Sequence, residues 1–598
     1  MHRLASIEIV NFRSCRHASL LLDEFTPIVG YNNAGKSNIL SAIEWLIDSS
    51  ALSAADFYDT NHPLQIIGIV TGINQALLEA MPVNQMNAIT PYLAGDELHF
   101  RRTMAQPGNA ASAKLEVRDP TAPVQDDDAW KPSPTGIPQT LKTLFPDVIR
   151  VQAMQNAADD VGKFGKTNTI GKLIAEIIEP IKLAHAVHLT DALNLIASKL
   201  SADGDERAEE LVAFDTGASA QLAELFPGLQ IKFDVPLPEI PDLFKGGTVR
   251  VLETTGGNTA LRSFDSVGHG AQRCIQMALI RYLAERKAAT QENKRTLLLI
   301  DEPELYLHPQ GVEQIRLALK RLASGSYQIV FSTHSPLMLH RDQASHTVIV
   351  RKQTHLEGTV IRKPLASAVT EAIEVAQHQS RVLFELGKAA DVFFSDRVLL
   401  NEGKTEQRIL PQLYEAMLGR TAASDRIGMI PMDGSGNLAG ALRALASMEI
   451  ESKAVADLDF AFVQAGKAGL IDRENDPEVL AAKILLAKLQ KTIGFSLGPN
   501  GLPQNNKKSE WSAADVWATF ALDSEGVNIV NVQRVKLLQH GIWVWAAGTI
   551  EDVLGVRDKG EDAIQVFEQE INALSAEQLI KLYPAVNDLF SWVRDAGT

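Results

Sequence analysis

The chain has 598 residues, 45% of them hydrophobic and 22% charged, which is typical of a soluble protein with two to four domains. A net charge of −16 argues against a general coating of nucleic acid, although it leaves room for a local basic groove. There is no apolar run near the roughly 18 residues of a membrane span, no signal-peptide core and only two cysteines, Cys15 and Cys274, so we expect a cytoplasmic protein without a disulfide framework or a zinc site.

A phosphate-binding loop follows the first predicted strands, at residues 4–10 and 20–22. Phe25–Val29 is a short apolar run suited to a buried strand, and residues 30–37 then read Gly-Tyr-Asn-Asn-Ala-Gly-Lys-Ser. This matches G-x-x-x-x-G-K-[ST], in which Lys36 would reach the β- and γ-phosphates and Ser37 would hold Mg²⁺. A helix predicted from Asn38 to Leu46 would add its N-terminal N–H groups. The expected ATP contacts are Asn32, Asn33, Ala34, Gly35, Lys36, Ser37 and Asn38.

A long segment separates this loop from the residues that would complete its site. Further strands are predicted at 66–70, 98–102, 114–118, 148–152, 230–233 and 248–253, with a loop at 120–138. Apolar residues recur at helical spacing through 167–228. This helical insertion is equally compatible with a dimerisation arm and with a lid packed on its own domain.

Two glycines and two carboxylates follow the insertion. Gly268 and Gly270 precede a helix predicted at 271–287, and glycines at a helix N-terminus form an anion site. The apolar run Thr296–Ile300 ends in Asp301 and Glu302. We assign Asp301 to the Mg²⁺ shell of the nucleotide, and Glu302 to polarisation of the attacking water.

Acidic residues also end strands in the second half of the chain. After a predicted helical link at 366–389, a strand from Arg397 runs into Glu402, and Glu406 lies four residues later. Another strand is predicted at 427–431, and a third, at 453–456, ends in Asp457-Leu458-Asp459, whose two aspartates would point the same way in extended chain. Parallel strand ends meet at one sheet edge, so these carboxylates predict a site for Mg²⁺ or Mn²⁺. The alternative is two independent acidic loops.

Several motifs resemble those of known ATPases. Ile9-Val10-Asn11-Phe12-Arg13-Ser14 resembles the opening of SMC- and RecF-type ABC ATPases. Residues 266–273 resemble their signature motif without a standard L-S-G-G-Q, 331–336 resemble the switch histidine loop, and 305–309 resemble the turn after the second carboxylate. The chain from Arg397 on resembles a Toprim domain. An ABC head followed by Toprim is the layout of the OLD (overcoming lysogenization defect) family of ATP-dependent endonucleases.

This resemblance implies an α/β fold with two catalytic parts. The implied domains are an ABC ATPase head in two parts, 1–160 and 246–365, a helical insertion at 161–245, a helical linker at 366–394 and a Toprim nuclease domain at 395–598. The glycines Gly268 and Gly270 would face ATP in a partner subunit, which implies a homodimer or higher homo-oligomer, and His334 would sense the γ-phosphate. Gln152 matches a nucleotide-contacting glutamine or is an ordinary strand residue.

The resemblance also implies further nuclease residues after the aromatic strand predicted at 541–547. Thr549 and Glu551 match additional metal ligands, and Lys559 would stabilise charge on the scissile phosphate, with Lys581 as the competing candidate. The implied substrate is DNA, the implied role is antiphage defence, and the family leaves room for a partner protein such as a helicase. DNA sequence preference, the cut pattern and the direction of ATP control stay open.

Two other functions compete with this interpretation. A RecF- or SMC-like DNA-binding ATPase without nuclease activity would need no carboxylate series after Val398. A topoisomerase-like strand transfer would need a nucleophilic tyrosine in a separate module, and the tyrosines of this chain show no such setting. An ATP-dependent, metal-dependent DNA endonuclease therefore leads.

Overall fold

The computed structural model of the chain describes residues 2–123, 127–145, 148–153, 169–236, 238–243, 249–255, 258–288, 295–325, 327–339, 346–352, 357–362, 389–504, 510–556 and 561–595. Two compact units are formed, one by Met1–Thr140 with Val330–Thr598 and the other by Leu141–Ile329. The second unit is thus inserted in the sequence of the first. Most of the predicted linker lies outside the described residues. Within the described ranges, no helix is both long and apolar enough to cross a membrane.

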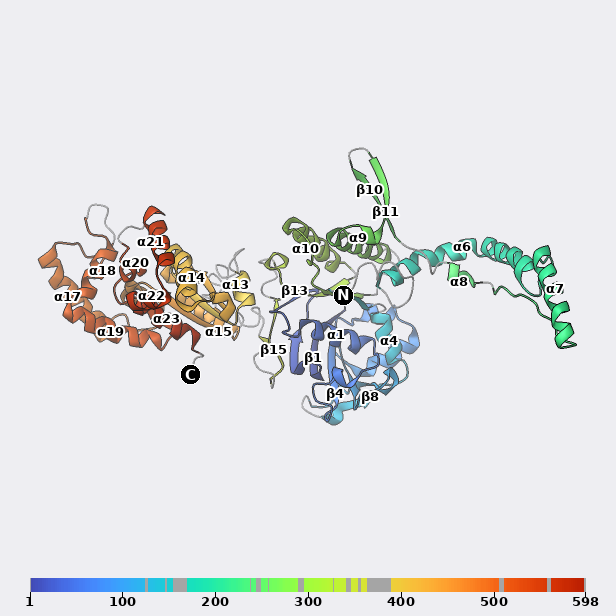
Figure 1. The fold of residues 1–598 in the computed structure, drawn as a ribbon. Coiled ribbons are helices and arrows are strands. Elements are labelled where there is room, and N and C mark those ends of the chain that lie inside the picture. The colour runs from blue at the N-terminus through green and yellow to red at the C-terminus, as the bar shows by residue number, and fades with distance from the viewer. Residues whose placement is uncertain are drawn as a thin grey trace. The chain divides into compact units, whose positions relative to one another are not determined.

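An antiparallel sheet opens the first unit, with strand order β2-β1-β4-β6-β7-β8 and β5 on β6. Every second residue of β4 is buried, as expected of a sheet with one face toward a core. Helix α1 (Lys36–Ile47) packs there (Figure 1). Gly68 leaves space for the Leu46 side chain of this helix. The predicted strands are confirmed, but β8 falls inside the predicted loop at 120–138. The bounds are β1 (Arg3–Phe12), β2 (Cys15–Leu21), β4 (Leu64–Thr71), β5 (Leu93–Ala94), β6 (Glu97–Met104), β7 (Lys114–Arg118) and β8 (Trp130–Pro132).

In the first unit β14 lies between β15 and β3, and in the second unit β12 pairs with β9 in parallel. All residues of β12 and β13 are buried, because strands of a parallel sheet are covered on both faces. The strands are β3 (Phe25–Val29), β9 (Val148–Val151), β12 (Thr296–Asp301), β13 (Tyr327–Thr333), β14 (Val348–Lys352) and β15 (Thr359–Arg362). Shorter helices are α2 (Gln75–Glu79), α3 (Val83–Ile89), α4 (Ile137–Leu144), α8 (Ile240–Leu243), α13 (Ala389–Phe394) and α16 (Ala465–Lys467).

The second unit carries the predicted helical insertion. Helices α6 (Thr169–Leu200) and α7 (Glu209–Leu225) extend away from α9 (His269–Ala288) and α10 (Pro309–Ala323) of the same unit (Figure 1). None of the residues of α7 is buried, which favours an arm over a lid. The predicted strand at 230–233 is wrong, because Phe233 instead donates its N–H to the Asp215 carboxylate of α7. Strands β10 (Arg250–Thr255) and β11 (Asn258–Ser263) form a separate hairpin.

The C-terminal part of the first unit has the predicted parallel sheet, and its four strands lie in the order β17-β16-β18-β19. Neighbouring residues of β16 pack on opposite faces, with Val398 and Leu400 in one core and Leu399 in the other. The strands are β16 (Arg397–Asn401), β17 (Ile427–Pro431), β18 (Glu451–Ala456) and β19 (Ile542–Val544). The helices are α14 (Lys404–Leu418), α15 (Leu438–Ser447), α17 (Pro477–Ile493), α18 (Ala513–Leu522), α19 (Ser524–Leu538), α20 (Ile550–Leu554), α21 (Glu561–Ala573), α22 (Ala576–Leu582) and α23 (Pro584–Arg594).

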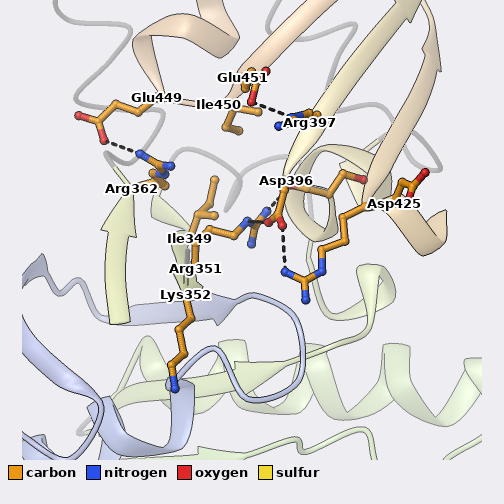
Figure 2. A pocket seen from close by; sticks show the side chains of 12 residues that line it. Ile349, Arg351, Lys352, Arg362, Asp396, Arg397, Asp425, Glu449, Ile450 and Glu451 are labelled. Carbon is orange, nitrogen blue, oxygen red and sulfur yellow. Dashed lines mark hydrogen bonds and ion pairs between the residues drawn. The ribbon is translucent and has the colours of Figure 1, made fainter. Parts of the chain in front are cut away.

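A charged cavity of about 320 Å³ lies in this unit, between β14 and β15 on one side and the first residues of β16 and β18 on the other (Figure 2). Its lining includes four arginines and four acidic residues. Most of these charges are paired, for example Arg397 with Glu451 at 2.9 Å and Arg362 with Glu449 at 3.5 Å.

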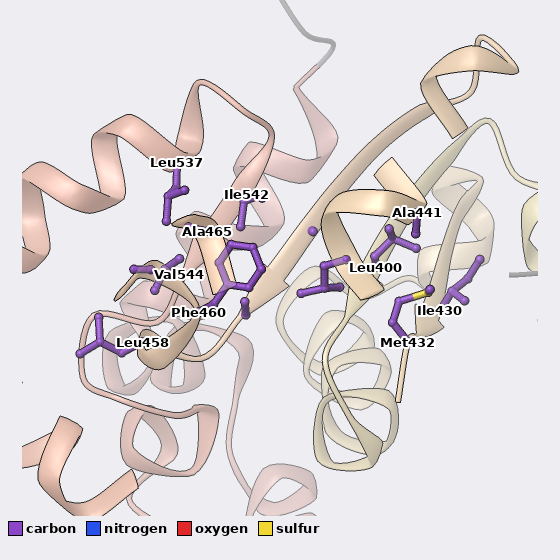
Figure 3. Packing of buried hydrophobic residues seen from close by; sticks show 14 of the residues in the cluster. Leu400, Ile430, Met432, Ala441, Leu458, Phe460, Ala465, Leu537, Ile542 and Val544 are labelled. Atoms are coloured by element: carbon purple, nitrogen blue, oxygen red, sulfur yellow. The ribbon is translucent and has the colours of Figure 1, made fainter. Parts of the chain in front are cut away.

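One of the two cores beside the parallel sheet combines residues from distant parts of the sequence. Leu400 and Ile430 from the strands pack with Ala441 of α15, and Phe460 packs with Leu537 of α19 (Figure 3). Helix α17 contributes Leu485 and Leu486 to the same core. Although residues 461–515 are largely polar, they therefore include a helix that completes the domain core.

Candidate nucleotide and nuclease sites

The predicted phosphate loop joins β3 to α1 in the first unit. Gly35 caps the helix with a φ of 106°, a conformation that side chains disfavour. A Cβ atom at Gly35 would lie 2.1 Å from the Thr359 hydroxyl, and one at Gly30 would lie 2.3 Å from the Val350 carbonyl. Both glycines are therefore required by close approach. The helix begins at Lys36, two residues earlier than predicted.

Lys36 and His334 are brought together within the first unit. The Lys36 ammonium lies 2.8 Å from His334 Nε2, 3.0 Å from the Gly30 carbonyl and 3.1 Å from the Tyr31 carbonyl. An ammonium only donates hydrogen bonds, so the imidazole accepts at Nε2. Three of the other residues predicted to contact ATP are exposed, as a ligand site requires: Asn32, Asn33 and Ser37. Asn38 is half-buried and Ala34 is buried.

Asp301 ends β12 in the second unit and Glu302 follows it, and two arginines hold this pair. The Arg150 guanidinium pairs with the Asp301 carboxylate at 2.5 Å, and both side chains are largely buried. Arg273 of α9 donates to the carbonyls of Asp301 at 2.8 Å and Glu302 at 3.1 Å. These bonds hold Glu302 in a left-handed backbone conformation, with a φ of 45°. The predictions missed both arginines, although a charged residue in the apolar strand at 148–151 was a visible signal.

The two glycines of the signature-like segment differ in their surroundings. Gly268 has open space around it, whereas a Cβ atom at Gly270 would lie 2.8 Å from the Tyr306 carbonyl. His269 also places its ring 5.2 Å from that of Tyr306. In this chain the segment thus packs against the turn that follows Asp301 and Glu302, and Gly270 permits that contact. Gln152 is exposed and follows β9.

The acidic residues of the C-terminal sheet gather at the carboxyl ends of β16 and β18. The Asp457 N–H donates to Glu402 Oε2 at 3.3 Å. Glu406 is buried in the first turn of α14, and Glu551 accepts a bond from the Thr405 hydroxyl at 3.0 Å. Asp457 is close enough to feel the charges of the other carboxylates predicted to converge here, Glu402, Glu406, Asp459 and Glu551.

Proton affinities in this cluster are raised by burial and by repulsion. Burial, followed by the charges of Glu402 and Glu406, raises the pKa of Asp457 well above its usual range. Burial, followed by the charge of Asp459, raises the pKa of Glu402 to about 7. Burial also raises the pKa of Asp459. A cation would relieve this cost by neutralising the carboxylates.

The donor set fits a hard divalent cation. Asp457 Oδ1 and Asp459 Oδ1 are buried and accept no hydrogen bond from the residues that the structure describes. Carboxylate oxygens suit Mg²⁺ or Mn²⁺. Among the described residues, no three acidic, histidine or cysteine side chains yet form a closed metal-binding group. The carboxylates thus offer oxygen ligands of the kind that such a cation takes.

The D-x-D segment and Thr549 have other surroundings than predicted, the main lysine candidate is not described, and one residue was missed. The D-x-D segment is not extended, because the chain turns into a helix at Leu458, whose N–H bonds the Gly548 carbonyl at 2.7 Å. Thr549 caps α20, and its hydroxyl bonds Asp552 rather than an acidic cluster member. Lys559 lies outside the described residues, and Lys581 is in the last turn of α22. Ser435, which the predictions missed, bonds the Glu402 carboxylate.

Comparison with known proteins identifies the family. A family model for an AAA ATPase domain matches residues 3–74 and 128–339, and one for the TOPRIM domain of overcoming lysogenization defect protein-like sequences matches 393–459. The chain is 32% identical over 600 residues to the Old nuclease of Escherichia phage P2, covering 99% of this chain and 100% of the relative. The chain belongs to the OLD nuclease family. This OLD nuclease is an ATP-dependent nuclease with an ATPase part and a Toprim part, which generally use a nucleotide and divalent metal.

More distant relatives cover about two thirds of this OLD nuclease. The OLD nuclease of Thermus scotoductus is 24% identical over 442 residues, which are 69% of this chain and 74% of the relative. The endonuclease GajA of Bacillus cereus is 22% identical over 438 residues, 69% of this chain and 68% of the relative. A solved SMC head bound to the C-terminal winged-helix domain of ScpA is 16% identical, with a TM-score of 0.33, over 60% of this chain and 97% of that chain.

Proposed function

We propose that this OLD nuclease cuts DNA at a Mg²⁺ or Mn²⁺ centre in its Toprim part. The supporting observation is the buried carboxylate cluster, in which two aspartate oxygens accept no hydrogen bond from described residues. The proposed ligands are Glu402, Glu406, Asp457, Asp459, Glu551 and Thr549. Bound divalent cations would supply an activated water and charge stabilisation at the leaving oxygen.

The protein's own residues have distinct proposed roles in that centre. Ser435 orients Glu402, and Thr405 orients Glu551 through the 3.0 Å hydrogen bond. Thr549 also starts α20, since its hydroxyl caps that helix. Lys559 would stabilise negative charge on the scissile phosphate.

ATP is the proposed ligand of the phosphate loop, and its state controls cleavage. Lys36 would leave the loop carbonyls to bind the phosphates, and His334, which touches it, would sense the γ-phosphate. Ser37 and Asp301 would hold Mg²⁺, and Glu302 would polarise water. Gly268 and Gly270 would face ATP of a second subunit, so we propose a homodimer or higher homo-oligomer. Antiphage defence and a helicase-like partner stay predictions from the family.

A paired assay on the same preparations tests this function. Plasmid cleavage with Mg²⁺ or Mn²⁺ and phosphate release from ATP are measured for each variant. Asp457→Ala and Glu402→Ala should lose at least about a hundredfold in cleavage and keep ATP hydrolysis, since a nuclease metal ligand is gone. Glu474→Ala is the matched control, because Glu474 is an exposed acid of the same part.

The ATPase variants complete the assay. Lys36→Ala should lose ATP binding, because the phosphates lose their cationic partner, whereas Glu302→Gln should bind ATP and hydrolyse it slowly. Wild-type cleavage by Asp457→Ala would remove the nuclease assignment, and the DNA-binding ATPase would then be favoured. Wild-type hydrolysis by Glu302→Gln would remove its catalytic role.

A further inference from the structure

Tyr31 of the phosphate loop contacts an arginine from the Toprim part of the same unit. The Arg426 guanidinium lies 4.2 Å from the centroid of the Tyr31 ring, a cation–π geometry. Arg426 stands in the turn before β17, in a left-handed backbone conformation with a φ of 57°. The contact therefore joins a nucleotide-binding segment to a turn beside the nuclease sheet.

Arg426 is in turn attached to the start of β16. Its Nη1 lies 3.0 Å from Asp396 Oδ2, and its carbonyl accepts the N–H groups of Asp396 at 2.8 Å and Arg397 at 3.2 Å. Strand β16 begins at Arg397 and ends at Asn401, immediately before Glu402. A displacement of Arg426 would thus act directly on the strand that carries a proposed metal ligand.

A buried arginine reinforces this connection from the side of β14. Arg351 pairs with the other Asp396 oxygen at 3.2 Å and donates to the carbonyls of Phe393 at 2.7 Å and Ser395 at 2.8 Å (Figure 2). The next residue, Lys352, donates its backbone N–H to the Tyr31 hydroxyl at 2.8 Å. The end of β14 therefore holds both Tyr31 and Asp396 in place on either side of the Arg426 contact.

Phosphate binding would change the hydrogen bond between Lys36 and the Tyr31 carbonyl. In this structure the Lys36 ammonium bonds the carbonyls of Gly30 and Tyr31 and the ring of His334. An ammonium has three donors, so Lys36 has to give up bonds of this kind to reach a phosphate. The loss of the Lys36 bond to the Tyr31 carbonyl would free that peptide to turn, and the ring under Arg426 would move with it.

We propose that Arg426 is the positioning residue through which the phosphate loop acts on the nuclease centre. Movement of Tyr31 shifts Arg426, Arg426 shifts Asp396 and Arg397, and β16 carries the change to Glu402. The inference rests on the proposed function, in which ATP controls cleavage, and adds the residues that transmit the control. Arg426 itself touches neither phosphate nor metal ligand, so its removal should spare both centres.

The experiment compares plasmid cleavage rates with and without saturating ATP. Arg426→Ala should still bind ATP and still cut DNA, but its cleavage rates with and without ATP should agree within about twofold. An allosteric ligand typically changes the affinity of another site by a factor of about 5 to 150. Arg426→Lys should keep part of the ATP effect. A lysine retains the positive charge over the Tyr31 ring but lacks the planar guanidinium that bonds Asp396. Arg420→Ala is the matched control, since Arg420 is equally exposed and pairs with Asp425 in the same turn.

A double variant tests the route itself. If Arg426 acts through Tyr31, adding Tyr31→Leu to Arg426→Ala should not change the rate ratio further. Melting temperature and ATP affinity are measured for every variant, which separates loss of coupling from loss of folding or of binding.

The possible failures are distinct. If wild-type protein does not cut DNA, or cuts equally with and without ATP, the proposed function falls and the inference falls with it. If wild type responds to ATP and Arg426→Ala responds equally, only the inference is overturned. Loss of the response in Arg420→Ala as well would also overturn it, because the turn rather than the Arg426 contact would then be responsible.

Discussion

The acidic residues of the Toprim part are costly to hold together without a cation. Each buried carboxylate loses hydration, and its neighbours repel its charge, so the metal-free protein retains protons that the unfolded chain would release. Glu402 shows this most clearly, since burial and the Asp459 charge raise its pKa from 4.5 to about 7. The same side chains therefore link metal affinity, pH and stability.

Stability without metal should decrease as pH rises. The raised pKa of Glu402 means that its proton stabilises the fold below about pH 4.5 and that this stabilisation is lost as pH rises toward about 7. We expect a loss on the order of 2 kcal/mol between these limits, and a recovery when Mn²⁺ replaces the proton. Melting curves at pH 5.5 and 8, with chelator or Mn²⁺, measure both effects.

Glu402→Gln serves as the control for this titration, because an amide cannot ionise. Its metal-free melting temperature should depend less on pH than that of the wild type. Two results would contradict the raised pKa of Glu402. One is a metal-free wild type whose melting temperature increases from pH 5.5 to 8. The other is an increase in melting temperature on adding Mn²⁺ that is no larger at pH 8 than at pH 5.5.

At the scale of elements, both centres use the carboxyl ends of buried parallel strands. In each case a strand ends, a glycine follows within a few residues, and a helix begins, at Gly35 before α1 and at Gly403 before α14. The phosphate loop adds a tight backbone approach, since Thr359 of β15 bonds the Ala34 carbonyl at 3.0 Å. The loop conformation is thus held by a strand far away in sequence.

Gly35→Ala should disrupt the phosphate loop without unfolding its sheet. An alanine would hold a disfavoured φ of 106° and place its Cβ atom 2.1 Å from the Thr359 hydroxyl. We expect ATP affinity to fall at least about tenfold, because conformational strain of this kind costs about 1–3 kcal/mol. Gly95→Ala is the control, since Gly95 also has a positive φ but open space around it. Unchanged ATP affinity in Gly35→Ala, measured by calorimetry, would refute this role of the loop.

At the scale of the whole molecule, one chain carries an ATPase part and a nuclease part, and its arm leaves apolar side chains exposed. Leu183 and Val187 of α6 are 74% and 70% exposed, and Leu225 at the end of α7 is 74% exposed. Such a concentration of exposed apolar residues is typical of an interaction surface. A second copy of the chain is the occupant that the proposed ATP arrangement requires.

Charged residues on α6 should therefore weaken assembly. Leu183 and Val187 are four residues apart and share one helix face, so Leu183→Asp with Val187→Asp would place two charges in the interface. Light scattering should give wild type at least twice the 65.2 kDa mass of one chain, and the double variant a lower mass at equal concentration. Leu522→Asp, at an 85% exposed position of the Toprim part, is the control. A monomeric wild type, with and without ATP, would exclude the dimer.

The sequence by itself determined the local motifs. Glycine and lysine spacing predicted the phosphate loop, and acidic residues after apolar runs predicted carboxylates at two sets of strand ends, because such features depend on a few consecutive residues. The parallel sheet of the Toprim part followed from the same order of strands and helices. The local pattern predicted a strand at residues 230–233, where the backbone instead bonds a side chain of α7. It also predicted an extended chain at Asp459, where a helix has already begun.

Only the tertiary structure decided which distant residues meet. Arg150 lies 151 positions from Asp301 yet neutralises it, and Arg273 supports the strained Glu302 backbone. Arg426 lies over Tyr31, although nothing near either residue in the sequence marks the pair. Charge pairs and ring contacts of this kind depend on how strands are ordered in a sheet and how two sheets are packed. Hydrophobic burial along the whole chain determines that arrangement, which no short motif encodes.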